Sequence, residues 1–443
     1  MARPWLSIVG IGEDGFDGLS AAARDLIERA ELIVGGKRHL ALVGSLGTPT
    51  LEWETPFSAT IPKVLAHRGQ RVVALCSGDP FWYGAGSALA EAVPAAETVA
   101  IPAPSTFAWA AARLRWRLEE TVTLGLHARP IELLRPHLRS GARLIVLVRD
   151  GAATAQVAGY LKGIGFGPSR LTVLEALGGP RERIRTTIAT EFALDDITAP
   201  VALAIEAVAE PGAVIVPRIA GLPDDLFAHD GQLTKREIRA VTLSTLAPRG
   251  GELLWDVGAG AGSIGIEWLL AHPANRAIGI EAREDRLDRA RSNALSLGVP
   301  HFDLRLGTAP EALKDLPTPD AIFVGGGAGR EGVLDAAWQA LPPGGRLVVN
   351  SVTLETEAIL IARQARHGLT ARGARFLTRL RVATSPSLLT RSNKIRHTPT
   401  IPLELTILRG TSRRFSIRRI LRMPSSRITT MAWDTCGSSR MPT

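Results

Sequence analysis

A glycine-rich turn between residues 253 and 267 constrains the fold of this 443-residue chain more than any other feature. A short apolar run that contains Asp256 leads into the turn, and an apolar-periodic helix follows directly. Gly258 and Gly260 let the backbone approach a ligand closely, whereas Gly262 permits tight packing of the helix on the strand. The start of that helix offers free N–H groups. The pattern predicts the first strand, turn and helix of a doubly wound nucleotide-binding sheet.

An acidic residue, Glu281, ends the next apolar run, 19 residues after Gly262. A carboxylate at the end of a second strand is where a ribose diol would be held. This geometry suits two ligands, a dinucleotide or S-adenosylmethionine. Asp256 would repel a diphosphate but tolerates the cationic methionine end of S-adenosylmethionine, so the residues favour the methyl donor. The remaining alternative is a strand, turn and helix that bind no ligand.

The length and cysteine content of the chain limit its class. At 443 residues, two or three domains are expected. No apolar run reaches the ~20 residues that span a bilayer, and the N-terminus enters a strand without a signal segment. Cys76 and Cys436 lie far apart, which argues against a disulfide framework and a cysteine-based metal site. We therefore expect a cytoplasmic enzyme that has no membrane partner and no metal.

The basic character of the chain is confined to its end. From Arg379 to Thr443 there are 13 Lys and Arg against Glu404 and Asp434, so this part has a net charge of +11. The net charge of the whole chain is +9. The preceding residues are slightly acidic, which argues against a nucleic-acid partner. Residues 385–443 are predicted to be a largely disordered tail. A basic arm for RNA and a shifted reading frame are the alternatives.

The N-terminal half alternates strands and helices. Continuous apolar runs such as 71–76, 143–149 and 200–205 are separated by helical segments. They predict a mostly parallel sheet that is covered on both faces. A Pro- and Gly-containing linker is expected at 211–233, between a first domain at 1–210 and a second at 234–384. A capping box from Thr234 to Glu237 is expected to open the first helix of the second domain.

Motifs in both halves resemble known families. The N-terminal half resembles the tetrapyrrole (corrin/porphyrin) methylases. It does so through four pieces: Val9-Gly10-Ile-Gly12-Glu-Asp-Gly15, Ala30-Glu-Leu-Ile-Val-Gly35-Gly-Lys-Arg38, Ser77-Gly78-Asp79-Pro80 with Tyr83-Gly84, and Pro104-Ser105-Thr106. Where the wider superfamily usually has proline after the second glycine, this chain has Glu13.

The C-terminal half resembles the decarboxylating methyltransferases of the same pathway. It carries Thr234-Lys-Arg-Glu237, the glycine-rich turn, Pro319-Asp-Ala-Ile-Phe-Val-Gly-Gly-Gly327 and Pro343-Gly-Gly-Arg-Leu-Val-Val-Asn350. The fused order is similar to that of the bifunctional precorrin-6Y C5,15-methyltransferase (decarboxylating) family. This resemblance implies an α/β protein with a tetrapyrrole methylase domain followed by a doubly wound, Rossmann-like methyltransferase domain.

The resemblance also implies a reaction and its ligands. The reaction is methylation of precorrin-6Y at C5 and C15 with decarboxylation of the ring C acetate, giving precorrin-8x in cobalamin synthesis. The partners would be a tetrapyrrole substrate, S-adenosylmethionine at two sites per chain, and further copies of the chain in a homo-oligomer. The residues implied to bind the donor are Gly10, Gly12, Ser77, Gly78, Asp79, Pro80, Tyr83, Ser105, Thr106, Thr234, Asp256, Gly258, Gly260, Gly262, Glu281, Gly307 and Ala309.

No side chain is assigned a catalytic role. A sulfonium donor is strongly electrophilic, so the protein has mainly to align the reactants and exclude water. Arginines are expected to bind the carboxylates of the substrate, and the candidates are Arg38, Arg129, Arg149 and Arg330. A methylase fusion that acts on another tetrapyrrole and an RNA methyltransferase that uses the basic tail remain as alternatives.

Overall fold

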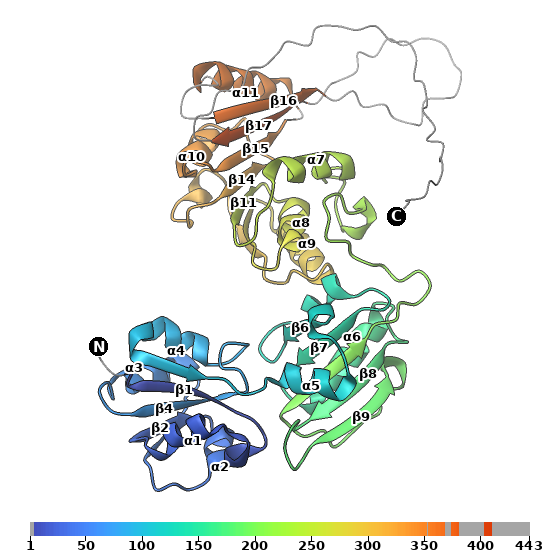
Figure 1. Cartoon of the computed structure of the whole chain (residues 1–443). Coiled ribbons are helices and arrows are strands. Elements are labelled where there is room, and N and C mark those ends of the chain that lie inside the picture. Colours follow the sequence, from blue (N-terminus) through green and yellow to red (C-terminus); the bar gives the residue numbers. More distant parts are fainter. Residues whose placement is uncertain (1–3, 352, 368–373, 381–402, 410–443) are drawn as a thin grey trace, which may run out of the picture.

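The computed structural model describes residues 4–351, 353–367, 374–380 and 403–409, which form three β-sheets flanked by helices (Figure 1). The first two sheets belong to the N-terminal half, and the third belongs to the C-terminal half. The α/β class predicted from the sequence is confirmed. No helix in these ranges combines the length and apolar character that crossing a bilayer requires.

The first sheet is entirely parallel and has the order β3-β2-β4-β1-β5. Strand β1 lies between β4 and β5 and is buried along its whole length, because helices cover both faces of the sheet. The strands are β1 (Leu6–Ile11), β2 (Leu32–Gly35), β3 (Thr50–Glu52), β4 (Val72–Ser77) and β5 (Thr98–Ile101). The helices are α1 (Ala21–Glu28), α2 (Lys37–Val43), α3 (Thr60–Leu65) and α4 (Gly86–Ala92).

The second sheet has the order β6-β7-β10-β8-β9, and only β6 and β7 pair in parallel. Its strands are β6 (Val122–Gly125), β7 (Arg143–Leu147), β8 (Arg170–Glu175), β9 (Arg183–Ile188) and β10 (Val201–Glu206). The helices α5 (Thr106–Leu114) and α6 (Gly151–Gly163) pack on it. The expectation of a mostly parallel N-terminal sheet is therefore wrong for this part. The chain between β8 and β10 contains no α-helix, and antiparallel strands need no helical crossover.

The third sheet has the order β13-β12-β11-β14-β15-β17-β16, and its first five strands are parallel. This is the doubly wound arrangement that the glycine-rich turn predicts. The parallel strands are β11 (Leu253–Val257), β12 (Arg276–Glu281), β13 (Asp303–Leu306), β14 (Ala321–Val324) and β15 (Arg346–Asn350). The helices are α7 (Arg236–Leu246), α8 (Ser263–Ala271), α9 (Glu284–Ser296), α10 (Val333–Ala340) and α11 (Leu354–His367).

Two antiparallel strands complete this sheet beyond β15, as Figure 1 shows in orange and red. They are β16 (Ala374–Leu380) and β17 (Leu403–Arg409). The predicted tail at 385–443 lies, apart from β17, outside the described residues.

The capping box expected at Thr234 is not formed. Helix α7 begins at Arg236, its N-cap is Lys235, and no side chain caps it. Thr234 instead turns its backbone carbonyl toward the buried guanidinium of Arg239, which donates a hydrogen bond to it. This contact holds Thr234 outside the helix.

The segment predicted as a linker, 211–233, is in contact with both halves. Ala213 packs on the core of the second sheet, whereas Val216 is already buried in the core of the third. Further along, Leu222 and Phe227 join that same core. The domain boundaries themselves stay a prediction, and a few side chains anchor this segment to each core while most of its residues are exposed.

Candidate functional site

A recess of the C-terminal half lies where the carboxyl ends of the parallel strands meet. It is a cavity of about 810 Å³, a size typical of small-molecule sites. Six of the residues implied to bind the donor line it: Thr234, Gly258, Gly260, Glu281, Gly307 and Ala309. The structure thus brings together residues that are separated by up to 75 positions in the chain.

The glycine-rich turn follows β11 and forms one wall of this cavity. Gly258, Gly260 and Gly262 all have positive φ, between 58° and 77°, which favours glycine at each position. A side chain at Gly258 would lie 2.9 Å from the backbone of Gly326, so the turn packs directly on the glycine loop after β14. At Gly260 the same direction is open for at least 4.0 Å. Gly262 packs against Ala290 and does not line the cavity.

The backbone N–H groups of Gly258, Ala259 and Gly260 have partners inside the protein. Those of Gly258 and Ala259 donate to the carbonyl of Ile280, and that of Gly260 donates to the Glu281 carboxylate at 2.8 Å. A dinucleotide diphosphate would need such N–H groups as donors. Their internal use, next to two buried carboxylates, favours the methyl donor over a dinucleotide.

Asp256 lies beneath the cavity rather than in its wall. Its side chain is buried, and its Oδ2 accepts a hydrogen bond of 3.0 Å from the N–H of Gly265 in the first turn of α8. The other oxygen, Oδ1, is buried and has no hydrogen-bond partner within the described structure. Burial, and then the nearby Glu281 carboxylate, raise the pKa of Asp256 to about 7. Asp256 therefore stabilises the start of α8, next to the turn that faces the ligand.

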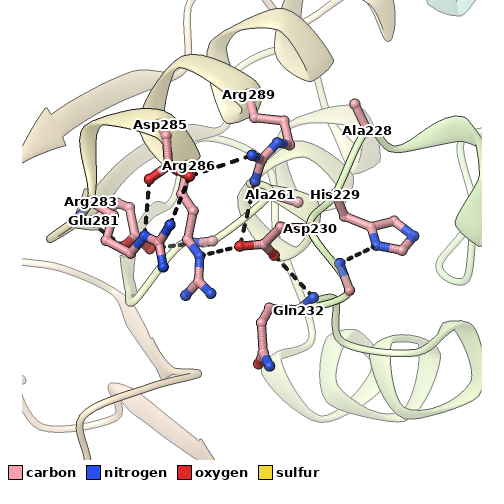
Figure 2. Close-up of polar contacts among 12 residues, drawn as sticks. Ala228, His229, Asp230, Gln232, Ala261, Glu281, Arg283, Asp285, Arg286 and Arg289 are labelled. Atoms are coloured by element: carbon pink, nitrogen blue, oxygen red, sulfur yellow. Dashed lines mark hydrogen bonds and ion pairs between the residues drawn. The ribbon is translucent and has the colours of Figure 1, made fainter.

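Glu281 joins two loops at the cavity wall. Its Oε2 accepts the N–H of Gly260, and its Oε1 accepts the N–H of Arg283 at 3.1 Å (Figure 2). Two hydrogen bonds from backbone N–H groups orient the carboxylate in this 6% exposed position. The position after β12 is the one predicted for a group that binds a ribose diol.

A strap formed by residues 228–235 crosses beside α9 and supplies Gln232, Thr234 and Lys235 to the cavity wall (Figure 2). Asp230 fixes the strap, because its Oδ2 lies 2.8 Å from Nε of Arg286 on α9. The hydrogen bond from Arg286 is the main cause that lowers the pKa of Asp230 to about 2. Sequence reasoning singled out Thr234 of this strap but neither Asp230 nor Gln232.

Three loops of the N-terminal half meet at the carboxyl end of the first sheet. A side chain at Gly10 would lie 1.9 Å from the carbonyl oxygen of Gly78, and one at Gly78 would lie 2.8 Å from Cα of Ser105. The N–H of Ala103 donates to Gly78, and that of Gly78 donates to Ile11. Backbone therefore packs on backbone here, and this contact accounts for the glycines without requiring a ligand.

The other residues implied for this site are placed around that contact. Asp79 accepts the N–H of Phe81 at 2.9 Å and so closes a tight turn at Pro80. Ser105 caps α5, whose first residue is Thr106. Tyr83 reaches the second sheet, where its hydroxyl donates to the carbonyl of Thr123. Gly12 lies next to Asp14, and Ser77 is exposed at the end of β4.

Two family descriptions match the chain. Residues 6–193 match the tetrapyrrole (corrin/porphyrin) methylases, and residues 225–390 match the precorrin methyltransferase domain. A precorrin-6Y C(5,15)-methyltransferase [decarboxylating] from Sinorhizobium sp is 50% identical over 83% of this chain and 89% of its own length. A protein of the same name from Mycobacterium tuberculosis (strain ATCC 25618 / H37Rv) is 39% identical over 82% and 90%.

The chain belongs to the precorrin-6Y C5,15-methyltransferase (decarboxylating) family. It is accordingly a methyltransferase, and the resemblance read from its motifs is confirmed. The crystal structure of the C-terminal domain of precorrin-6Y C5,15-methyltransferase from Rhodobacter capsulatus is also similar. It has 42% sequence identity and a TM-score of 0.38, and it covers 43% of this chain and 99% of that one.

The four arginines of this chain that were considered as ligands for substrate carboxylates differ in their surroundings. Arg330 is exposed at the cavity. Arg38 lies at the carboxyl end of the first sheet. Arg149 is exposed and pairs with Asp150, whereas Arg129 lies near His301 and contributes, after burial, to lowering the pKa of that histidine. Only the first two are placed beside the glycine loops.

Several residues at the two sites escaped the sequence analysis. Asn350 ends β15 at the cavity, and its place at the carboxyl end of a parallel strand was a usable signal. Lys235 also lines the cavity, but it looked like an ordinary surface lysine of a helix start. Arg181 gave no signal, because its partner Glu13 lies 168 residues away in the chain.

Proposed function

We propose that this chain methylates precorrin-6Y at C5 and at C15 and decarboxylates the ring C acetate, using S-adenosylmethionine. The observation that carries the proposal is that one chain holds two unrelated glycine-loop systems, each at the carboxyl end of a parallel sheet. The names of the relatives that match most of the chain support the substrate and both positions.

The two activities are proposed to be divided between the halves. The N-terminal half would methylate C5, and the C-terminal half would methylate C15 and release carbon dioxide. A probable cobalt-precorrin-6B C(15)-methyltransferase (decarboxylating) from Saccharolobus solfataricus is 38% identical over 31% of this chain and 72% of its own length. A relative of that size supports a separable unit for the C15 chemistry.

The C-terminal cavity fits both reactants. Gly260 presents open backbone, and Glu281 presents a carboxylate oriented by two backbone N–H groups, so one end can take the adenosine of the donor. The exposed loop 325–327, the Lys235 ammonium and the Arg330 guanidinium lie on the rest of the wall, where a substrate that carries carboxylates would be held. The cavity then acts by alignment and by exclusion of water.

Decarboxylation requires an electron sink, which the substrate itself can supply. Transfer of the methyl group forms a C–C bond at C15 as the S–C bond breaks, and it leaves a conjugated iminium in the macrocycle. Cleavage of the C–C bond to the acetate carboxylate then delivers its electron pair to that iminium. No proton donor of the protein is needed for this step, and none of the cavity side chains is assigned as one.

The direct test is incubation of the full chain with precorrin-6Y and S-adenosylmethionine, followed by mass spectrometry. The expected product has gained two methyl groups and lost one carbon dioxide. Calorimetric titration of the folded chain should also find two donor sites. A stoichiometry of one would remove one half from the mechanism, and an unmethylated product would reject the proposal.

A further inference from the structure

A group of charged side chains joins the two sheets of the N-terminal half at the edge where its glycine loops meet. Glu13 follows β1 and is only 7% exposed. Its Oε1 accepts a hydrogen bond from Nη1 of Arg38, and its Oε2 accepts one of 2.8 Å from Nη2 of Arg181. Arg38 belongs to the first turn of α2, on the first sheet, whereas Arg181 belongs to the loop between β8 and β9, on the second.

We infer that Arg38 and Arg181 form a carboxylate-recognition site for the tetrapyrrole, with Glu13 as the residue that positions both guanidinium groups. The inference rests on the proposed function, since it assigns the substrate carboxylate that the C5-methylating half would bind. Glu13 itself would not contact the substrate, because its side chain is buried behind the two arginines.

The charge balance of the group favours an anion. Two guanidinium groups share the single carboxylate of Glu13, and the neighbouring His39 adds no charge near neutral pH because burial, and then Arg38, lower its pKa to about 4. Most N–H donors of Arg181 remain unused, since within the described part of the chain only its Nη2 donates a hydrogen bond, to Glu13. The Arg181 side chain is 58% exposed and that of Arg38 is 35% exposed, so both remain accessible.

The geometry places this site next to the glycine loops that are implied to hold the methyl donor. Nη2 of Arg38 donates to Oγ of Ser77 at 2.7 Å, and Ser77 precedes Gly78, which packs on Gly10 and Ser105. On the other side, a side chain at Gly179 would lie 2.5 Å from Cβ of Glu13. Gly179 therefore lets the loop that carries Arg181 approach β1, and a bound carboxylate would lie beside the loops implied to hold the donor.

The position of Glu13 gives the inference its specificity. A carboxylate in this place converts two guanidinium groups from separate sheets into one preorganised fork, and guanidinium groups bind carboxylates with directional, charge-assisted hydrogen bonds. We therefore expect Glu13 to affect binding of the tetrapyrrole and not binding of the methyl donor.

The test compares Glu13→Gln and Arg181→Gln with a matched control, Glu97→Gln, in the full chain. Glu97 also pairs with an arginine, Arg68, but it precedes β5, at the amino end of the same sheet. Each site variant should raise the KM for tetrapyrrole in C5 methylation roughly tenfold to a hundredfold, the range expected for a lost charge-assisted hydrogen bond. The value of kcat and the calorimetric Kd for S-adenosylmethionine should change less than about twofold, and C15 methylation should be unchanged.

The outcomes separate this inference from the function on which it rests. If the wild-type chain does not methylate C5 of precorrin-6Y, the proposed function fails. If the wild type does so and the KM of both site variants equals that of Glu97→Gln, the carboxylate site is overturned while the function stands. Because Arg181 is exposed, its variant should fold even if Glu13→Gln does not. A weaker donor Kd in Arg181→Gln would likewise contradict a site for substrate alone.

Discussion

Arg239 of α7 and Glu267 of α8 form an ion pair in which the arginine side chain is fully buried and that of the glutamate is 1% exposed. The Glu267 oxygens also accept the N–H groups of Gly221 and Leu222, and Arg239 donates to the Leu222 carbonyl and lies over the Phe227 ring. The pair thus fastens the segment that enters the C-terminal half onto its first two helices.

Replacing Arg239 with Met should destabilise the C-terminal half by about 3–5 kcal/mol, because the Glu267 carboxylate would stay buried without its counter-ion. Thermal unfolding measured by calorimetry should show this loss in one transition. Arg291→Ala removes an exposed pair with Asp288 and should change stability by less than about 0.5 kcal/mol. Equal effects of the two substitutions would mean that the buried pair has no special role.

Asp256 should make the stability of the C-terminal half depend on pH. Its pKa in the folded chain, about 7, is above the ordinary value of 3.8, so its contribution is complete below pH 4 and is lost as the pH rises through 7. Asp256→Asn stays neutral, and its advantage over the wild type should grow to the order of 3 kcal/mol between pH 4 and pH 8. Urea unfolding at several pH values measures this difference. The exposed Asp288→Asn serves as the control, and a pH-independent difference for Asp256→Asn would contradict the assigned cause.

Glu281→Gln should weaken donor binding in the C-terminal cavity by about 1–3 kcal/mol, since it removes a charged acceptor that also orients Gly260. C15 methylation and carbon dioxide release should fall together, while C5 methylation continues. Product analysis by mass spectrometry distinguishes the two, and Glu284→Gln, an exposed change on α9, is the control. An equal fall in C5 methylation would show that the proposed division between the halves is wrong.

Gly78→Ala should disrupt the N-terminal site while leaving the C-terminal site active. The new methyl group would lie 2.8 Å from Ser105 Cα, and the φ of +53° adds strain of about 1–2 kcal/mol. Gly69→Ala imposes a positive φ as well but meets nothing within 4 Å, so it isolates the backbone effect. We expect calorimetry to find one donor site instead of two in Gly78→Ala only.

A flexible insertion of six residues between Val214 and Ile215 should leave both donor affinities unchanged. It should increase the amount of singly methylated tetrapyrrole that escapes into solution during turnover. The measurement is the ratio of singly to doubly methylated product at early times, with the same insertion after Ser45, in the loop between α2 and β3, as the control. An unchanged ratio would show that the length of the connection is irrelevant to transfer.

The sequence predicted the C-terminal half well because its signals are local. Buried strands and the helices between them follow directly from apolar runs, and β11, the glycine-rich turn and α8 appear in the predicted order. In the second sheet, strand direction depends on connections and not on the runs themselves. The apolar strands β7 and β10 therefore gave no sign that they pair antiparallel.

The candidate sites were predictable only as far as they follow strand ends. Residues next to β1, β4, β11 and β12 were found in this way. Arg181 and Asp230 were not found, because they lie in loops and each pairs with a residue that is distant in the sequence. Asp256 was expected to contact the donor, but its side chain faces the start of α8 instead of the cavity. A strand pattern shows that a residue is buried but not which helix it faces.

The contacts of Ala213 and Val216 with different cores leave only two residues between the halves that are anchored to neither. So short a tether confines each active site to the neighbourhood of the other at all times. Confinement within a few tens of ångströms corresponds to an effective concentration in the millimolar range. Under the proposed division of activities, a tetrapyrrole that leaves one half would meet the second site at a concentration that does not depend on how much enzyme the cell makes.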